Sequence, residues 1–228
     1  MINIWPSINL DRLSKTTASR SPEDALDLYQ SYQAFSHVHM IDIQGIEREK
    51  PQATDKIFQL ITRSQLPVVV GGGIRSIEAI EQYLKSGVDA IAIGNKGLSD
   101  LLWLKQITNR YPNKIYLVLN ANVNEILQNE WKQKSRLTVS DIIHKVKDFK
   151  LKGIIYKDLS KDGKLLGPNI EMNKEIVGLT NLPIIAAGGI RNIEDIKLLE
   201  AVGVKACIVD RACETASFFE ALPKKEVN

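Results

Sequence analysis

Residues 66–75 read LPVVVGGGIR, and residues 182–191 repeat this stretch as LPIIAAGGIR, 116 positions later. The same register continues without a gap through Gly87-Val88 and Gly203-Val204. Chance does not maintain such an alignment, so we infer that the two segments descend from one duplicated unit. Each copy has the pattern of a buried strand, a glycine turn, a helix and a second strand. The natural unit of the fold is therefore half of the chain.

The composition is typical of a soluble globular protein, because hydrophobic residues make up 44% of the 228 positions and charged residues 25%. The net charge is only +3 and no basic stripe occurs, so we expect no nucleic-acid partner. No apolar run is long enough for a bilayer and the first residues do not resemble a signal peptide, so we expect a cytoplasmic protein without membrane contact. The two cysteines, Cys207 and Cys213, suggest buried thiols rather than a disulfide framework.

Short β-branched runs alternate with amphipathic helical patterns along the whole chain. The expected strands are residues 2–8, 37–43, 67–70, 90–93, 115–119, 153–156, 183–186 and 206–209. Eight strands and eight helices in a duplicated chain predict one α/β domain, a (β/α)₈ TIM barrel made of half-barrels at about 1–112 and 113–228. A doubly wound open sheet is the alternative, but it does not explain why the count reaches eight in two equal halves.

Two glycine pairs follow strands and directly precede helices. The backbone N–H groups at such turns lie at the positive end of the helix dipole, where they can bind a phosphate. Glycines can also simply make a tight turn. Two copies in matching places favour a ligand with a phosphate at each end. The expected phosphate-binding residues are Gly72, Gly73, Arg75, Gly94, Asn95, Gly188, Gly189 and Arg211.

The two phosphate sites differ at one position, because Gly94 of the first copy is Asp210 in the second. We call Gly72, Gly73, Gly94 and Asn95 the first cradle. The second cradle is Gly188, Gly189, Asp210 and Arg211. A carboxylate adds bulk and like-charge repulsion against a phosphate, which pairing with Arg211 would offset only in part. We therefore expect a competent first cradle and an impaired second one.

The motifs of this chain resemble those of the ProFAR (phosphoribosylformimino-5-aminoimidazole carboxamide ribotide) isomerases of histidine biosynthesis. The matching segments are residues 5–10, 37–42, 70–76, 158–169, 188–190 and 211–212. The resemblance covers essentially the whole chain. It implies a TIM barrel, a phosphorylated ribosyl substrate and an Amadori rearrangement of an aminoaldose to an aminoketose without cofactor or metal. We also expect a monomer.

This sequence departs from the family at the catalytic positions. The family places aspartates at the ends of the first and fifth strands, where this chain has Asn9 and Asn120, and only the later Asp162 is retained. Lys157 stands where the family has threonine. Asparagine cannot carry a proton at neutral pH, and losing one general acid or base costs about 10²–10⁴-fold in rate. The loop after the first strand is also shorter than in the family, so we expect no substrate-covering lid.

These observations leave several functions open. The chain is an isomerase with weak or lost activity, in which Lys157 could replace a missing base, or a non-catalytic sugar-phosphate-binding or scaffold relative. The related cyclase of imidazole glycerol phosphate synthesis depends on the same two aspartates, so their absence argues against it equally. A new small-molecule activity on the same barrel is a further alternative.

The functional or structural role of several other residues stays open at this point. Asp42 and Asp158 are again 116 positions apart and could orient the substrate or cap a turn. Trp131 matches a family tryptophan that stacks on the substrate. His37 and His39 share one strand face like metal ligands, but no third ligand is evident, so we interpret them as packed or solvent-tipped residues.

Overall fold

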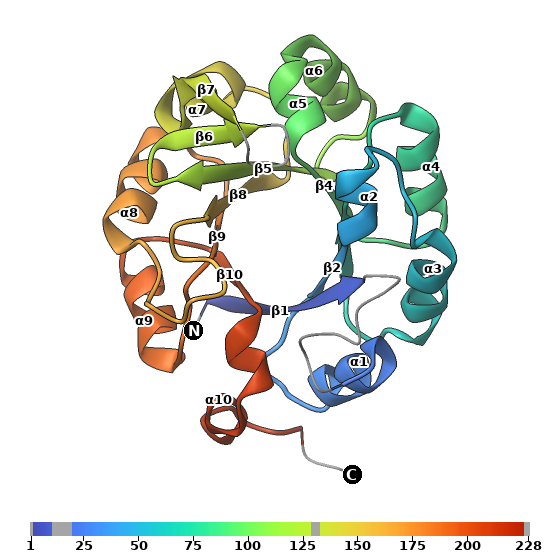
Figure 1. The fold of residues 1–228 in the computed structure, drawn as a ribbon, viewed down its shortest axis with the longest axis vertical. Helices are drawn as coiled ribbons and strands as arrows, with labels where there is room; N and C mark the ends of the chain where they lie inside the picture. Colours follow the sequence, from blue (N-terminus) through green and yellow to red (C-terminus); the bar gives the residue numbers. More distant parts are fainter. Residues whose placement is uncertain (1, 11–19, 129–132, 226–228) are drawn as a thin grey trace.

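The computed structural model describes residues 2–10, 20–128 and 133–225, with only the backbone described at 128 and 133–136. Eight parallel strands of this part of the chain close into a barrel (Figure 1). They are β1 (Asn3–Leu10), β2 (Val38–Asp42), β3 (Val68–Gly71), β4 (Ala90–Ile93), β5 (Ile115–Asn122), β8 (Gly153–Asp158), β9 (Ile184–Ala187) and β10 (Ala206–Val209). Pairing of β4 with β5 and of β1 with β10 completes the ring and excludes the open sheet.

The outer layer consists of helices that each follow one barrel strand (Figure 1). They are α1 (Pro22–Gln30), α3 (Thr54–Arg63), α4 (Ile77–Lys85), α6 (Leu101–Arg110), α7 (Val139–Val146), α8 (Ile170–Leu179), α9 (Ile193–Ala201) and α10 (Ala216–Glu220). Their starts follow from local chemistry: the Ser21 side chain caps α1 and Pro22 occupies its first position. None of the helices in the described ranges is long and apolar enough to cross a membrane.

Short helical turns lie at the mouth of the barrel, where strands end. These are α2 (Ile43–Glu47), α5 (Asn95–Ser99) and the 3₁₀ helix η1 (Arg211–Glu214). The last two occupy matching places in the two halves, directly after Gly94 and Asp210. They bring polar residues over the ends of β4 and β10.

All eight predicted strands are present, but the sequence did not predict a ninth and a tenth. β6 (Glu125–Gln128) and β7 (Gln133–Thr138) form an antiparallel hairpin that extends from the edge of β5, with Ala121 opposite Ile126. β5 accordingly continues to Asn122, beyond its predicted end. β6 has the buried Ile126 between polar ends and pairs with β5, and the mostly polar β7 pairs only with β6. Neither strand has the long apolar run that predicts the strands of the ring.

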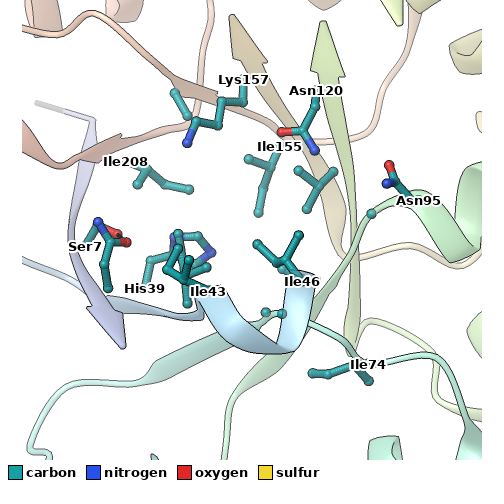
Figure 2. Close-up of a pocket in the computed structure, with 18 of the residues that line it drawn as sticks. Ser7, His39, Ile43, Ile46, Ile74, Asn95, Asn120, Ile155, Lys157 and Ile208 are labelled. Atoms are coloured by element: carbon teal, nitrogen blue, oxygen red, sulfur yellow. Dashed lines mark hydrogen bonds between the residues drawn. The ribbon is translucent and has the colours of Figure 1, made fainter. Parts of the chain in front are cut away.

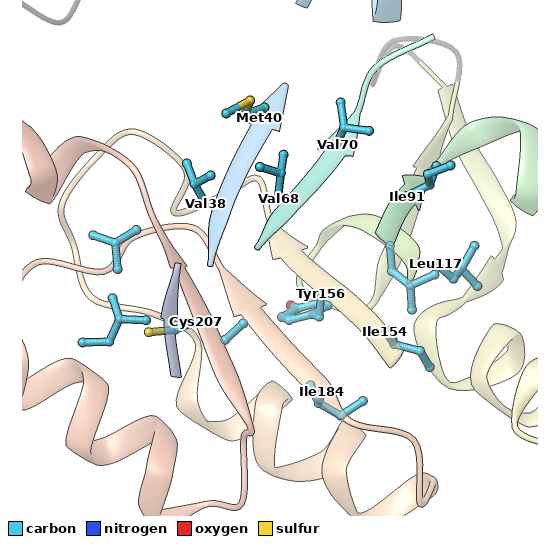
Figure 3. Packing of buried hydrophobic residues seen from close by; sticks show 14 of the residues in the cluster. Val38, Met40, Val68, Val70, Ile91, Leu117, Ile154, Tyr156, Ile184 and Cys207 are labelled. Atoms are coloured by element: carbon cyan, nitrogen blue, oxygen red, sulfur yellow. The ribbon is translucent and has the colours of Figure 1, made fainter. Parts of the chain in front are cut away.

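The core has two layers because successive strand residues face opposite sides. Val68 and Val70 point outward and pack with the helices, in the layer drawn in Figure 3, whereas Val69 faces the barrel interior. Trp5 and Tyr116 fill part of that interior, with ring centroids 5.5 Å apart. Cys207 and Cys213 are buried and free, as expected.

Candidate functional site

A cavity of about 290 Å³ opens at the carboxyl ends of the barrel strands. Its size suits a small metabolite. Apolar walls are formed by Ile41, Ile43, Ile46, Val118, Ile155 and Ile208, several of which surround the opening in Figure 2. The predicted site residues that it brings together are Asn9, Gly72, Gly73, Arg75, Gly94, Asn95, Asn120, Lys157, Asp162 and Gly188.

The remaining predicted site residues lie elsewhere. Gly189 and Arg211 border an adjoining space of only about 20 Å³. Asp210 lines both this space and the cavity. Asp42 and Asp158 are fully buried and do not line the cavity. Trp131 and the short loop expected after the first strand lie outside the described residues.

The glycine pair of the first cradle is required by the backbone itself. Gly72 has φ +112° and Gly73 has φ +66°, in the left-handed region that favours glycine. A Cβ on Gly72 would lie 2.2 Å from the carbonyl oxygen of Asp42. The turn thus accounts for these glycines whether or not a ligand binds.

Gly94 and Asn95 do not have such a structural explanation. A Cβ on Gly94 would meet nothing closer than the Asn120 amide nitrogen, at 4.0 Å, and the φ of Gly94 is an ordinary −102°. The side-chain Oδ1 of Asn95 is buried without a hydrogen-bond partner among the described residues. Open space beside one residue and an unsatisfied polar atom on the next are features of a site shaped for a ligand.

Arg75 supplies a cation to the rim of the first cradle. Its guanidinium pairs with Glu49 at 2.5 Å, and the Glu49 side chain is 61% exposed. An ion pair this exposed contributes little to stability, so Arg75 can exchange Glu49 for an anionic ligand. The matching Arg191 is instead held in two hydrogen bonds by the buried Asp195.

The second cradle has the same backbone and different contents. Asp210 has φ −112° and ψ −89°, close to the −102° and −116° of Gly94. Its carboxylate accepts hydrogen bonds from the Asn9 amide, at 3.3 Å to each oxygen. Arg211 pairs with Glu214 at 3.5 Å, and not with Asp210, the pairing that the sequence left possible.

Asp210 is held in a setting that favours its protonated form. Burial raises the pKa of its carboxyl, and repulsion from Asp162 and Glu214 acts in the same direction. The Asn9 hydrogen bond and the charge of Lys157 oppose this rise. A carboxyl group that can hold a proton therefore stands one strand away from the position where the family carries its first aspartate.

Lys157 and Asp162 form an ion pair in the same cavity, with Nζ 2.8 Å from Oδ2. Lys157 comes from β8, and Asp162 from the turn that follows this strand. The pairing means that Asp162 is not an unpaired carboxylate.

His39 lines the cavity, a position that sequence reasoning did not assign. It is 7% exposed, and its Nδ1 has no partner among the described residues. Burial, and secondly the charge of Lys157, lower the pKa of His39 to about 3, so the ring is neutral. The sequence did contain a signal for this position, because His37 and His39 are two positions apart and so share one face of their strand. His37 itself packs on Trp5, with ring centroids 4.8 Å apart, and no metal-binding group of three occurs in the described ranges.

Asp42 and Asp158 act as caps of their loops. The Asp42 carboxylate accepts hydrogen bonds from the backbone of Gly45, Gln52 and Ala53. Asp158 accepts from the backbone and hydroxyl of Ser160, and from the amide of Asn169. Of the two readings left open by the sequence, these contacts support the capping role.

Comparison with protein families gives one match over nearly the whole chain. Residues 9–218 match the model of the family described as "Histidine biosynthesis protein". The match begins at the last residues of β1 and ends in α10, so it includes both cradles and the cavity. The chain belongs to the family of histidine biosynthesis proteins.

Proposed function

We propose that this protein binds a small phosphorylated ribosyl compound through the first cradle and has lost efficient isomerisation of ProFAR to its aminoketose product. The observation that carries the proposal is the inequality of the two cradles. All four residues of the first cradle line the cavity of about 290 Å³. In the second cradle only Gly188 and Asp210 line it, Gly189 and Arg211 border a space of about 20 Å³, and Asp210 adds a carboxylate that repels a phosphate.

Phosphate binding at the first cradle rests on complementary features. The backbone at Gly72 and Gly73 approaches the ligand without side chains, Gly94 leaves open space, and Arg75 supplies a positive charge. The amide of Asn95 provides a polar group without a partner among the described residues. Together these groups favour a single phosphate at one end of the ligand.

Weak or absent isomerisation follows from the groups that would move protons. Asn9 and Asn120 cannot take up or release a proton at neutral pH. Asp162 is paired with Lys157 and Asp210 with Asn9. An aldose–ketose rearrangement needs a general acid and a general base at opposed positions, and this arrangement supplies no matched pair.

Restoring isomerisation would require a change at Asp210 as well as at Asn9 and Asn120. Because the Asn9 amide lies 3.3 Å from both oxygens of Asp210, an aspartate at position 9 would face a second carboxylate. Like charges at that separation cannot both be ionised easily. The substitutions Asn9→Asp and Asn120→Asp are therefore insufficient to restore isomerisation unless Asp210→Gly accompanies them.

Calorimetric titration with ribose 5-phosphate, together with ProFAR turnover assays, tests the proposal. We expect the wild-type protein to bind ribose 5-phosphate and to turn over ProFAR only weakly or not at all. The triple variant Asn9→Asp/Asn120→Asp/Asp210→Gly should exceed the double variant that retains Asp210. Efficient wild-type turnover would contradict the loss of activity, and absence of binding would favour a scaffold role.

A further inference from the structure

The cavity brings together polar groups from both halves of the barrel. In the register of β1 with β2, Ser7 lies beside His39 and Asn9 beside Ile41. In the matching register of β5 with β8, Val118 lies beside Ile155 and Asn120 beside Lys157. Lys157 thus takes the position that Ile41 has in the other half. A primary amine stands where the other half has an apolar side chain, at the end of a barrel strand where the fold places its chemistry.

The surroundings of Lys157 are those of an amine enclosed in a site. Its side chain is only 22% exposed, and Figure 2 shows its amine turned toward the opening, near Ile208. Ile155 and Ile208 line the same cavity. Lysine is a long residue that normally extends into solvent, so its enclosure between apolar walls calls for an explanation.

A second, independent feature points to a ligand at the same place. His39 is more than nine-tenths buried, lines the cavity and leaves Nδ1 without a partner among the described residues. A neutral imidazole there can accept or donate one hydrogen bond to a hydroxyl group. Ser7 and Asn9, which neighbour it on β1, line the cavity as well.

We propose that Lys157 forms a reversible imine with the carbonyl carbon of a phosphorylated aldose or ketose. The anchoring of the phosphate at the first cradle rests on the function proposed above, while the covalent step goes beyond it. Asp162 and Asp210 handle the protons, and His39 binds a substrate hydroxyl. The ligand class is a short carbonyl sugar with one terminal phosphate, because the first cradle is free of carboxylates and the second contains Asp210.

The proton transfers of this step balance with the groups present. Lys157 passes one proton to Asp162, and the free amine attacks the carbonyl carbon, forming the C–N bond while the carbonyl oxygen takes a proton from Asp210. The nitrogen then returns a proton to Asp210. Asp162 protonates the hydroxyl group, which leaves as water as the C=N bond forms.

The product is an iminium ion that keeps the positive charge beside the Asp162 carboxylate. The ammonium and carbonyl have become iminium and water, with no oxidant, reductant or metal consumed. The existing ion pair at 2.8 Å is therefore replaced by another ion pair with the same partner. Conserving the pair avoids leaving an unpaired charge between apolar walls.

Reductive trapping tests the proposal on the full chain. The protein is incubated with ribose 5-phosphate and cyanoborohydride, and modified peptides are mapped by mass spectrometry. We expect Lys157 to gain the mass of ribose 5-phosphate less one oxygen atom, at least about tenfold faster than the exposed Lys197 of α9. Inorganic phosphate should suppress the adduct at Lys157 and leave that at Lys197 unchanged.

Two variants and a binding measurement separate the outcomes. Lys157→Arg keeps the charge beside Asp162 without a nucleophile, and Lys157→Met removes both; each should abolish the adduct, with folding checked by thermal unfolding. Ribose 5-phosphate that binds by calorimetry but modifies Lys157 no faster than Lys197 would overturn the imine and leave the proposed function intact. Absence of both binding and adduct would overturn both proposals.

Discussion

The two halves of this barrel share a backbone and differ in chemistry. Gly72 and Gly188 both have positive φ, and a Cβ on either would collide with the carbonyl oxygen of Asp42 or Asp158. Gly94 and Asp210 also share their backbone conformation, yet one position is open and the other holds a carboxylate. Positions that the turn geometry constrains are glycine in both halves, whereas the position that the turn geometry leaves free differs between them.

The largest expected effect is on the constrained glycines. Gly72→Ala should destabilise the protein by about 3 kcal/mol or more, because its Cβ would lie 2.2 Å from a backbone oxygen at φ +112°. Gly188→Ala, with 2.6 Å and φ +94°, should cost somewhat less. Urea unfolding measures both, and Gly94→Ala serves as the near-neutral control. Equal costs at all three positions would contradict the distinction between them.

The next largest effect is expected when the carboxylate of the second cradle is placed in the first. Gly94→Asp copies the second half into the first, and should weaken ribose 5-phosphate binding about 10–100-fold through repulsion and lost space. The fold should tolerate the change, since the nearest atom to the new Cβ is 4.0 Å away. Calorimetry compares this variant with Gly94→Ala. Unchanged affinity in Gly94→Asp would show that the phosphate binds elsewhere.

A smaller effect concerns His39, whose counterpart by strand register is Ile155. Its pKa is lowered to about 3, so the unfolded chain binds a proton that the folded protein does not between about pH 6.5 and 3. Stability therefore falls as the pH decreases through this range, by roughly 1–2 kcal/mol between pH 7 and 5. His39→Ile should remove this loss. Urea midpoints at pH 7 and pH 5 measure it, and equal pH dependence in both proteins would refute the assignment.

The smallest effect is expected at Asp210. Since its pKa is raised, chiefly by burial, the folded protein holds a proton more tightly than the unfolded chain, and stability falls as the pH rises above the ordinary aspartate value. Asp210→Asn should abolish this dependence. The change should be smaller than that for His39, because Asn9 and Lys157 oppose the burial effect. Thermal unfolding from pH 4 to 7 compares the two proteins, and a wild-type stability that increases with pH through Asp210 would contradict the sign.

Many residues of the cavity could be predicted from their positions at or after the expected strand ends. Asn9, Asn120, Lys157 and Asp162 were predicted from their positions, and the cavity brings them together. The partner of Arg211 was left open by the sequence, and the structure pairs it with Glu214. The closeness of Asn9 and Asp210 did not follow from the sequence either, because it joins residues 201 positions apart.

The amino-acid sequence by itself determined the barrel, its duplication and the identity of the residues at the strand ends. Strand and helix periodicity and glycine turns are local signals, and a repeat needs no three-dimensional information to be read. Only the tertiary structure decided that Arg75 is exchangeable while Arg191 is held, that His39 faces the cavity, and that β6 and β7 extend from β5. Those outcomes depend on register, rotamers and burial across distant segments, which spacing along the chain does not encode.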